Sequence, residues 1–277
     1  MVLEYLVGLK EAEHRPWEMF FIGLLYSSVA LLLSLWIFKG HFGLNVVFLT
    51  TIASMPLIIN AINREKQQDM DMNDERSRLR SHSKVVSLFI FLFLGITLGF
   101  SLWYVFLPAP LAEDVFSMQI ATITSVDQQV VAGRAISDIK GISPSVAFSN
   151  IFQRNIKLLF FCLLFSFFYG AGAIYILALN ASFIGTAIGI FVTQAGNYAT
   201  GYPLALLRYL THGIPEIMAF FIAGLAGGII SIAIIKHDFK SKYFERVVFD
   251  SLDLVLLSVV YLVVATLIEV YVTPAFF

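Results

Sequence analysis

Charged residues are scarce in this chain of 277 residues. Asp, Glu, Lys and Arg make up 13% of it and leave a formal net charge of −1, against roughly 25% charged residues in a soluble domain. Without a basic patch to neutralise phosphates, we expect no nucleic acid among its partners. The chain has one cysteine, Cys162. That count excludes an internal disulfide, and Cys162 is most simply a small buried residue.

Several motifs of soluble catalytic or binding sites are also missing. The chain has no Gly-x-Ser-x-Gly elbow and no Walker A phosphate loop, which argues against a serine hydrolase and an ATPase. The run Asp69-x-Asp71-x-Asn73 begins like a calcium-binding loop. It then fails, because Asp74 stands where glycine is needed and Arg80 stands where a bidentate glutamate is needed. We expect no cofactor and no bound metal.

Apolar residues, in contrast, are abundant. They make up 58% of the chain, which contains 27 Phe, too much for a soluble fold to bury. A membrane-spanning helix needs about 20 such residues, so we predict an all-α, polytopic transmembrane bundle with about seven spans. The predicted spans are Trp17–Phe38, Phe42–Ile62, Val85–Leu107, Ile156–Leu179, Ala181–Thr193, Pro215–Ile235 and Leu252–Val272.

The basic residues predict the orientation of these spans. They concentrate in the segments 63–84 and 236–253, and an even number of intervening spans places both segments on one side. The positive-inside rule then predicts an N-terminus inside and a C-terminus outside. The segment 108–154 becomes an external loop that ends either as an amphipathic helix at the interface or as an ordinary solvated loop. A second short amphipathic piece is predicted at Tyr202–Leu210.

Three pairs of glycines recur at a spacing of four residues. Small residues at this spacing let helix backbones approach closely inside a membrane, so these pairs predict a compact bundle or a possible homo-oligomer. The six glycines are Gly95, Gly99, Gly185, Gly189, Gly224 and Gly228. Asn180, which separates two predicted spans, is interpreted as a turn residue.

The most specific polar motif is the run His212-Gly-Ile-Pro215-Glu216. One interpretation is purely structural, because a proline in the first turn and an acid near the positive end of the helix dipole make a well-formed helix start. The other is functional, because His212 and Glu216 are one helical turn apart and a polar group in a membrane is expensive.

Other polar residues are predicted at the same depth, near the outer end of the bundle. A polar cluster of six residues is therefore predicted there, with no catalytic residue and no metal ligand set: His212, Glu216, Arg208, Arg154, Asn155 and Glu269. A structural ion-pair network is favoured over a zinc site, because no His-Glu-x-x-His motif and no cysteine cluster is present. A proton-handling site is a further alternative.

The chain resembles the stage II sporulation protein M family of integral membrane proteins. The resemblance rests on Asn150-Ile-Phe-x-Arg-Asn155, on Gly170-Ala-Gly172, and above all on His212-Gly-x-x-Glu216 with the small-residue run that follows it. Thr211 stands where the family has proline. The resemblance implies a five-helix core at 85–277, with the external loop 108–154, preceded by a two-helix hairpin and cytoplasmic loop at 1–84.

The resemblance implies a scaffold. The predicted function is a non-enzymatic, multi-pass protein of the cell membrane that lies in the lipid bilayer and organises other membrane or envelope proteins. Two alternatives remain open. One is a transporter or channel-like protein with a polar path lined by His212, Glu216 and Glu269. The other is an intramembrane, metal-dependent enzyme.

Overall fold

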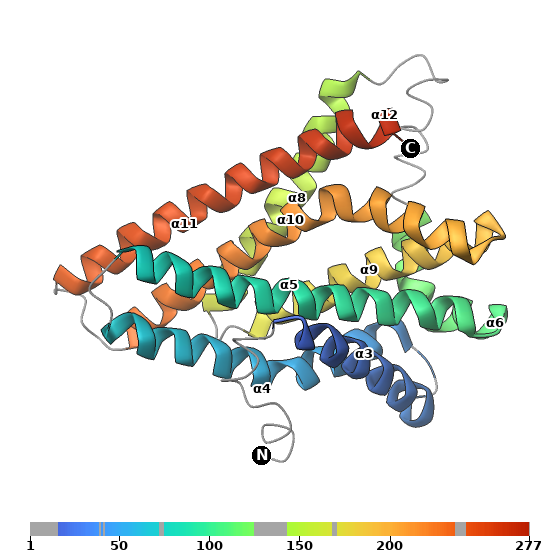
Figure 1. The fold of residues 1–277 in the computed structure, drawn as a ribbon, viewed down its shortest axis with the longest axis horizontal. Helices are drawn as coiled ribbons and strands as arrows, with labels where there is room; N and C mark the ends of the chain where they lie inside the picture. The colour runs from blue at the N-terminus through green and yellow to red at the C-terminus, as the bar shows by residue number, and fades with distance from the viewer. Residues whose placement is uncertain are drawn as a thin grey trace. The chain divides into compact units, whose positions relative to one another are not determined.

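The computed structural model describes residues 16–38, 40, 42–71, 75–124, 143–167, 171–235 and 242–276. Within these residues all regular structure is helical (Figure 1), which confirms the predicted all-α fold. The calcium-like run reaches Asn73, outside the described residues. Also outside the described residues are residues 125–142, in the middle of the predicted external loop, and residues 236–241, in the second basic segment.

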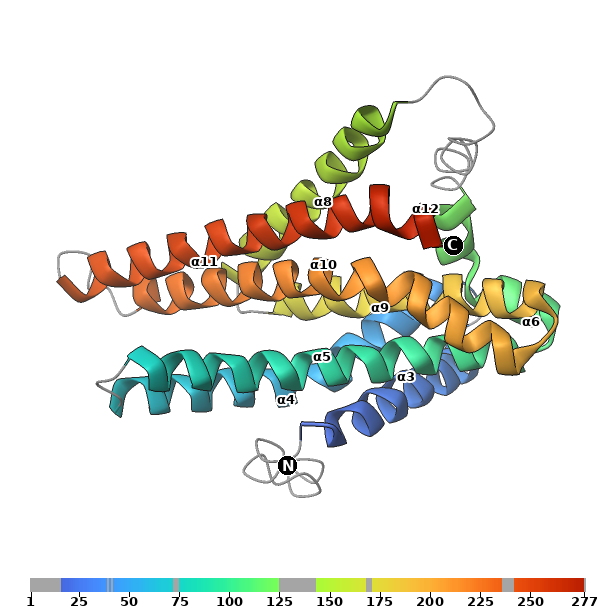
Figure 2. The ribbon, with the colours of Figure 1, turned by 45° about the horizontal axis from the view of Figure 1, so that its top comes forward.

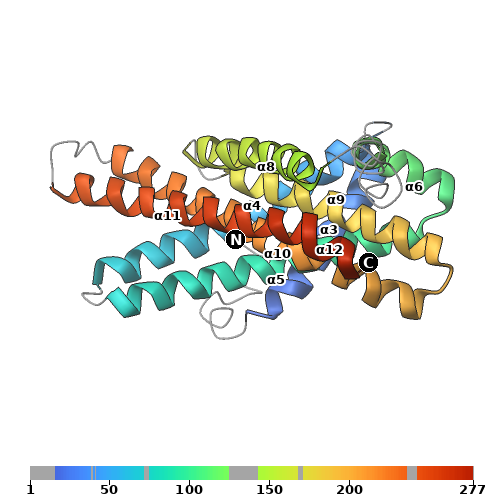
Figure 3. The ribbon, with the colours of Figure 1, turned by 90° about the horizontal axis from the view of Figure 1, so that it is seen from above.

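By its internal contacts the chain forms two compact units. The first comprises Met1–Ser117 together with Ala178–Gly189. Its helices are α3 (Glu18–Ile37), α4 (Phe42–Asp71), α5 (Glu75–Phe106) and the short α6 (Ala109–Val115), joined by part of α9. Helices α4 and α5 lie side by side as an antiparallel hairpin (Figure 3). The predicted boundary between an N-terminal hairpin at 1–84 and a family core at 85–277 is a different division of the chain, and it stays a prediction.

Glycines bring α3 and α5 into backbone contact. A Cβ added to Gly95 would overlap the carbonyl oxygen of Phe20, and one added to Gly99 would overlap the hydroxyl of Ser27. Trp103 adds a hydrogen bond, since its Nε1 donates to Oγ of Ser28 at 3.0 Å. We call this packing of α3 on α5 through Gly95 and Gly99 the glycine contact.

The second unit comprises Met118–Leu177 and Ile190–Phe277. It contains α8 (Pro144–Phe167), the two ends of α9 (Ala171–Ala195), α10 (Tyr198–Ile235) and α11 (Lys242–Leu267), followed by the π-helical turn η1 (Ile268–Val272) and α12 (Thr273–Phe276). Helix α10 packs on α8 and on α11, and Figure 2 shows α11 running along α10. Three helices of the second unit therefore share one contact.

Helices α9 and α10 are joined by only two residues. Gly196 follows the last residue of α9 at φ +67°, a left-handed conformation that glycine adopts without strain. Asn197 then caps α10, because its Oδ1 accepts a hydrogen bond from the backbone N–H of Ala199 at 3.0 Å. The chain thus reverses at Gly196 and Asn197, and the start of α10 is capped.

The predicted boundaries of the middle spans are wrong. Asn180 lies inside α9, which is continuous from Ala171 to Ala195, so it is not a turn. Helix α8 ends at Phe167, inside the single span predicted over Ile156–Leu179. The break between α8 and α9 follows Phe167, and the next reversal, between α9 and α10, lies at Gly196 and Asn197. Small or polar residues occur both there and at Asn180, so composition alone did not locate the turns.

Among the described residues, five helices are long and apolar enough to cross a membrane. They are Glu18–Ile37, Ser87–Phe106, Ile174–Ala195, Tyr198–Ser231 and Val247–Phe276. The apolar part of α4, Phe42–Leu57, is shorter, and α8 begins with a polar stretch. The count of seven spans and the orientation of the termini stay predictions.

Candidate functional site

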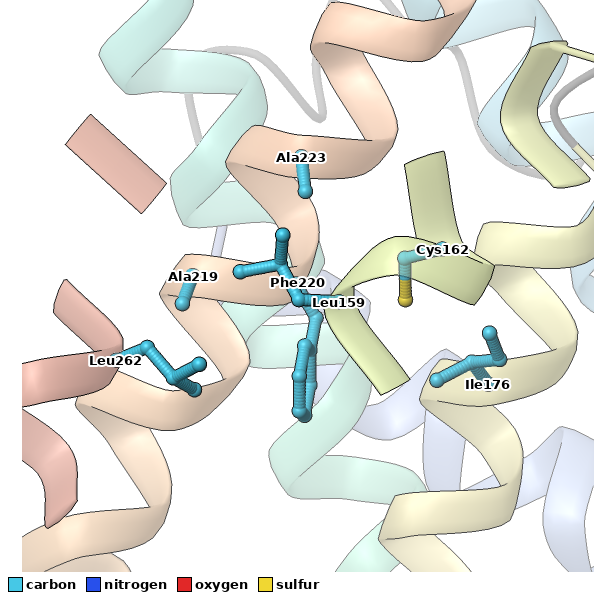
Figure 4. Close-up of a cluster of buried hydrophobic side chains, with 7 residues drawn as sticks. All are labelled: Leu159, Cys162, Ile176, Ala219, Phe220, Ala223 and Leu262. Atoms are coloured by element: carbon cyan, nitrogen blue, oxygen red, sulfur yellow. The ribbon is translucent and has the colours of Figure 1, made fainter. Parts of the chain in front are cut away.

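Helices α8 and α10 run in the same direction and keep a constant register. A Cβ on Gly227 of α10 would lie 2.5 Å from the carbonyl oxygen of Leu163 and 3.0 Å from the Cβ of Ser166. One turn earlier along both helices, Ala223 and Cys162 belong to one buried apolar cluster (Figure 4). Asn155 of α8 and Glu216 of α10 each lie two further turns toward the start of their helices.

Helices α10 and α11 are neighbours in the same unit and run in opposite directions. Leu262 of α11 belongs to the same apolar cluster as Ala219 and Ala223 and points toward Ala219 in Figure 4. Further along the two helices, His212 meets Thr273. The apolar cluster therefore passes directly into polar residues at the same three-helix contact.

The hydrogen bond of this site that joins two helices involves a residue that sequence analysis missed. Oγ1 of Thr273 lies 3.3 Å from Nδ1 of His212, and the same hydroxyl donates to the carbonyl oxygen of Ile268 at 3.2 Å. The only signal in the sequence was a hydroxyl residue one turn after Glu269. A short polar side chain near the membrane–water interface can be satisfied by water, so Thr273 did not indicate a partner within the protein.

The charged residues of the site interact through space. Glu216 is influenced by the charges of Glu269 and Arg154, and His212 by those of Glu269, Arg208 and Arg154. Within the described part of the chain, no ion pair joins either of these glutamates to an arginine. The site is therefore a cluster of neighbouring charges from α8, α10 and η1, and the direct ion-pair network expected for it is not seen.

Arg208 is held by aromatic rings. Its guanidinium carbon lies 5.8 Å from the ring centre of Phe191 and 5.7 Å from that of Tyr209. Contacts of this kind stabilise a guanidinium when it is partly removed from water. Arg208 therefore lies beside His212 and is engaged with rings, whereas Arg154 is the arginine that acts on Glu216.

Asn155 is the most deeply buried polar residue of the site, with 1% of its surface exposed. Its Oδ1 accepts a hydrogen bond from Nε of Arg154 at 3.4 Å, while its Nδ2 has no partner among the described residues. A buried donor without a partner is costly, commonly about 1–3 kcal/mol. The amide thus orients Arg154 and keeps one donor available.

The His212–Glu216 motif lies inside a helix, contrary to the predicted helix start. Helix α10 runs unbroken from Tyr198 to Ile235 and contains Pro215 (Figure 1). His212 lies fourteen residues after Tyr198, about 21 Å along the axis at 1.5 Å per residue, and not within one turn of a helix end. The predicted short helix at Tyr202–Leu210 is the first part of the same helix.

Two helix irregularities meet at this site. Pro215 has no N–H, so the carbonyl of Thr211 lacks its usual helical donor. On the facing element, η1 is a π-helical turn that contains Glu269 and directly precedes Thr273. Turns of this kind are rare and occur frequently at functional sites. The site thus combines polar side chains with backbone that departs from regular α-helix on both sides.

Metal binding gains no support from the arrangement. Across the described residues, no group of three His, Cys, Asp or Glu side chains is placed to hold a metal ion. The imidazole of His212 is instead within reach of the charge of Glu269, an arrangement suited to electrostatic contact.

The glycines predicted to pack helices differ in what they contact. Gly185 and Gly189 lie against α5, where an added Cβ would be 2.6 Å from the carbonyl oxygen of Thr97 and 2.8 Å from the Cβ of Tyr104. A Cβ on Gly228 would meet nothing within 4 Å. In the Gly224–Gly228 segment the glycine that contacts α8 is Gly227, and the packing role of Gly224 and Gly228 stays a prediction.

Comparison with known proteins identifies relatives of this chain. The sequence pattern of the family described as stage II sporulation protein M matches residues 87–274, which include every residue of the polar site. An uncharacterised protein of Methanocaldococcus jannaschii is 33% identical over 144 residues, covering 50% of this chain and 78% of that protein. No solved structure matches.

Proposed function

The chain belongs to the stage II sporulation protein M family, and on that premise we propose that it is a non-enzymatic scaffold. It is a membrane protein with apolar helices long enough to cross a bilayer. In the proposed role it crosses the cell membrane several times and holds other membrane or envelope proteins together.

The contact of α8, α10 and α11 is the observation that supports this role best. It is apolar at one level and polar at the next, with the His212–Thr273 hydrogen bond linking α10 to the end of α11. Such a contact fixes helix register, because sliding one helix would bring charged residues against apolar ones. A fixed register is what a scaffold needs to hold partners at constant positions.

Helix α11 supplies a surface for such partners. Its outward face carries an apolar stripe with exposed fractions between 43% and 64%: Leu252, Leu256, Val260, Val264 and Leu267. The opposite face is buried against the unit, where Leu262 is fully buried. The spacing of three or four residues matches the pattern by which one helix packs on another.

Photocrosslinking in native membranes tests the scaffold. A photoreactive residue at Leu256 should give a protein adduct of one discrete mass, and the same residue at Leu262 should give no intermolecular adduct. The two positions share one helix and one side-chain type and differ in exposure. Adducts with lipid alone at Leu256, repeated at Val260 and Val264, would contradict the proposal.

A second candidate is a transporter with a polar path lined by His212, Glu216 and Glu269. It is favoured by Pro215 within α10 and by the π-helical turn at Glu269, because transporters use interrupted helices at their binding sites. Solute uptake into vesicles that contain only the purified chain, abolished by Glu216→Gln and retained in the exposed-site variant Glu113→Gln, would favour this candidate over the scaffold.

A further inference from the structure

Helix α8 exposes one face, and the character of that face changes along the helix. Between Asn150 and Phe165 every exposed residue falls on it, at spacings of one and three residues that follow the helical repeat. The first four of these residues are polar and the last four are large and apolar: Asn150, Gln153, Arg154 and Lys157, then Phe160, Phe161, Leu164 and Phe165. The change from polar to apolar therefore takes place between Lys157 and Phe160, within one helical turn.

The opposite face of α8 is buried in the second unit, which fixes the direction of the exposed face. Leu159 and Cys162 belong to the apolar cluster that α8 shares with α10. The Cβ of Ser166 lies 3.0 Å from the place where a Cβ on Gly227 would be. Because this helix belongs to a membrane protein, exposed rings at its end favour a position in hydrocarbon, and the polar residues before them favour the boundary with water.

Two cations lie where the face changes from polar to apolar, and α8 itself holds no acid to offset them. Arg154 and Lys157 are three residues apart, so they are neighbours on the helix surface, and Pro144–Phe167 contains no Asp or Glu. Arg154 acts on the charge of Glu216 and donates from Nε to Oδ1 of Asn155, which does not use its terminal nitrogens. Among the described residues, Lys157 has no hydrogen-bond or ion-pair partner. Long cationic side chains in such positions direct their charged ends toward the headgroup region.

The apolar half of the face consists mainly of rings that pack on one another. Phe160 and Phe161 lie edge to face with ring centres 6.2 Å apart, and Phe161 stacks on Phe165 at 5.9 Å. Small residues, which let a second helix approach closely in a membrane, do not occur on this half. Phe165 lies eight residues beyond Lys157, about 12 Å along the axis, and one leaflet of hydrocarbon is about 15 Å thick. The face therefore suits flexible acyl chains better than another helix.

We propose that this face of α8 binds an anionic phospholipid. Lys157 and the terminal nitrogens of Arg154 donate to the phosphate oxygens, and the acyl chains lie along the exposed rings. A lipid with a quaternary ammonium group binds less well, because its positive charge meets two cations that have no acid beside them on the helix. The site goes beyond the proposed scaffold and does not depend on it, because the scaffold surface is on α11.

Photocrosslinking in vesicles tests the lipid site. The full chain carries a photoreactive phenylalanine derivative at Phe161, in vesicles of equal amounts of phosphatidylglycerol and phosphatidylcholine, and mass spectrometry measures the adducts with each lipid. Phosphatidylglycerol should be favoured by more than about fivefold, because one cation at an anionic surface contributes about 1 kcal/mol. The same derivative at Val260 of α11 should show no preference, since this position is exposed and apolar and no Lys or Arg lies between Asp250 and Val270.

Removing the charges separates the headgroup contact from the apolar face. Lys157→Gln should lower the preference at Phe161 about fivefold, and adding Arg154→Gln should abolish it. Gln153→Ala, an uncharged change on the same exposed face, should leave the preference intact. A wild-type chain without a preference, or a preference that survives the double variant, would overturn the site. An adduct at Phe161 with the mass of two chains would also overturn it, because a second copy would then cover the face.

Gel filtration and thermal unfolding check that each variant folds. If Arg154→Gln disturbs folding through the lost bond to Asn155, Lys157→Gln alone decides, and an unchanged lipid preference in that variant would overturn the site. The lipid ratio is measured in vesicles that contain only this chain, whereas the scaffold is tested by protein adducts at Leu256 in native membranes. Either result can therefore fail while the other stands.

Discussion

The glycine contact of α3 with α5 and the polar contact of α8, α10 and α11 join helices by opposite means. In the first, backbone approaches backbone, and Gly95 leaves no room for a side chain against Phe20. In the second, side chains fill the space between helices, and the contact ends in residues that carry charge. Of the helices in these two contacts, α3, α5, α10 and α11 are long and apolar enough to cross a membrane.

The difference teaches which property each contact is sensitive to. A glycine contact depends on volume, because dispersion forces and close approach hold helices together where lipid replaces water. The polar contact depends on charge and hydrogen bonding, and a change of shape matters less there than an unpaired group. Substitutions chosen for size and for charge should therefore separate the two regions.

The largest effect is expected from Gly95→Leu. The added side chain overlaps the carbonyl oxygen of Phe20, so α3 and α5 must separate, at a cost above about 3 kcal/mol. Thermal unfolding in detergent should show loss of the cooperative transition. The matched change Gly228→Leu should leave the transition in place, because a Cβ there meets nothing within 4 Å. Equal damage from both changes would mean that contact geometry is not what distinguishes them.

A smaller effect is expected at Glu216. Replacement by Ala removes a half-buried polar side chain and all its hydrogen-bonding groups from the contact, which should cost about 2 kcal/mol. Glu216→Gln keeps the shape and the hydrogen-bonding groups and should cost less. Denaturant unfolding of the three proteins measures the order, and a chelator should change none of the curves. If Gln destabilised as much as Ala, charge would outweigh shape in this contact.

The smallest effects are expected from single hydrogen bonds, one in each region. His212→Ala with Thr273→Val should show a coupling energy of about 0.6 kcal/mol in a double-mutant cycle, as is usual for interhelical bonds in membranes. Trp103→Phe with Ser28→Ala should give a similar value in the glycine contact. A measurable coupling energy in only one of the two cycles would show that interhelical hydrogen bonds contribute differently to the stability of the two contacts.

The sequence predicted the composition of the fold better than its breaks. Long apolar runs identified the helical class, because 58% apolar residues leave few other folds. The positions of turns were less certain. Pro215 suggested a helix start, yet a proline inside a spanning helix is tolerated where neighbouring helices and side chains satisfy the freed carbonyl. The reversal at Gly196 and Asn197 carried a turn signal no stronger than the one at Asn180.

The site could be predicted in its residues but not in its contacts. The rarity of charge in apolar runs drew attention to His212, Glu216 and Glu269, and the structure brings these three side chains near one another. Thr273 and the ring stacking of Arg208 depend on which helix faces which, information that a single sequence does not hold. The contact of Gly227 with α8 shows the same limit, because adjacent small residues leave the helix face ambiguous.

The π-helical turn η1 has a consequence for how relatives can differ in length. It accommodates one residue more than an α-helical turn would in the same stretch, so it is equivalent to a single-residue insertion near the end of α11. Deleting Val270 would remove that residue and close η1 into a regular α-helical turn, which leaves the residues beyond it in their present register. Thr273 would therefore still face His212 while Leu262 kept its place. Relatives that lack the π-helical turn should be one residue shorter between Leu262 and Thr273 and keep both contacts.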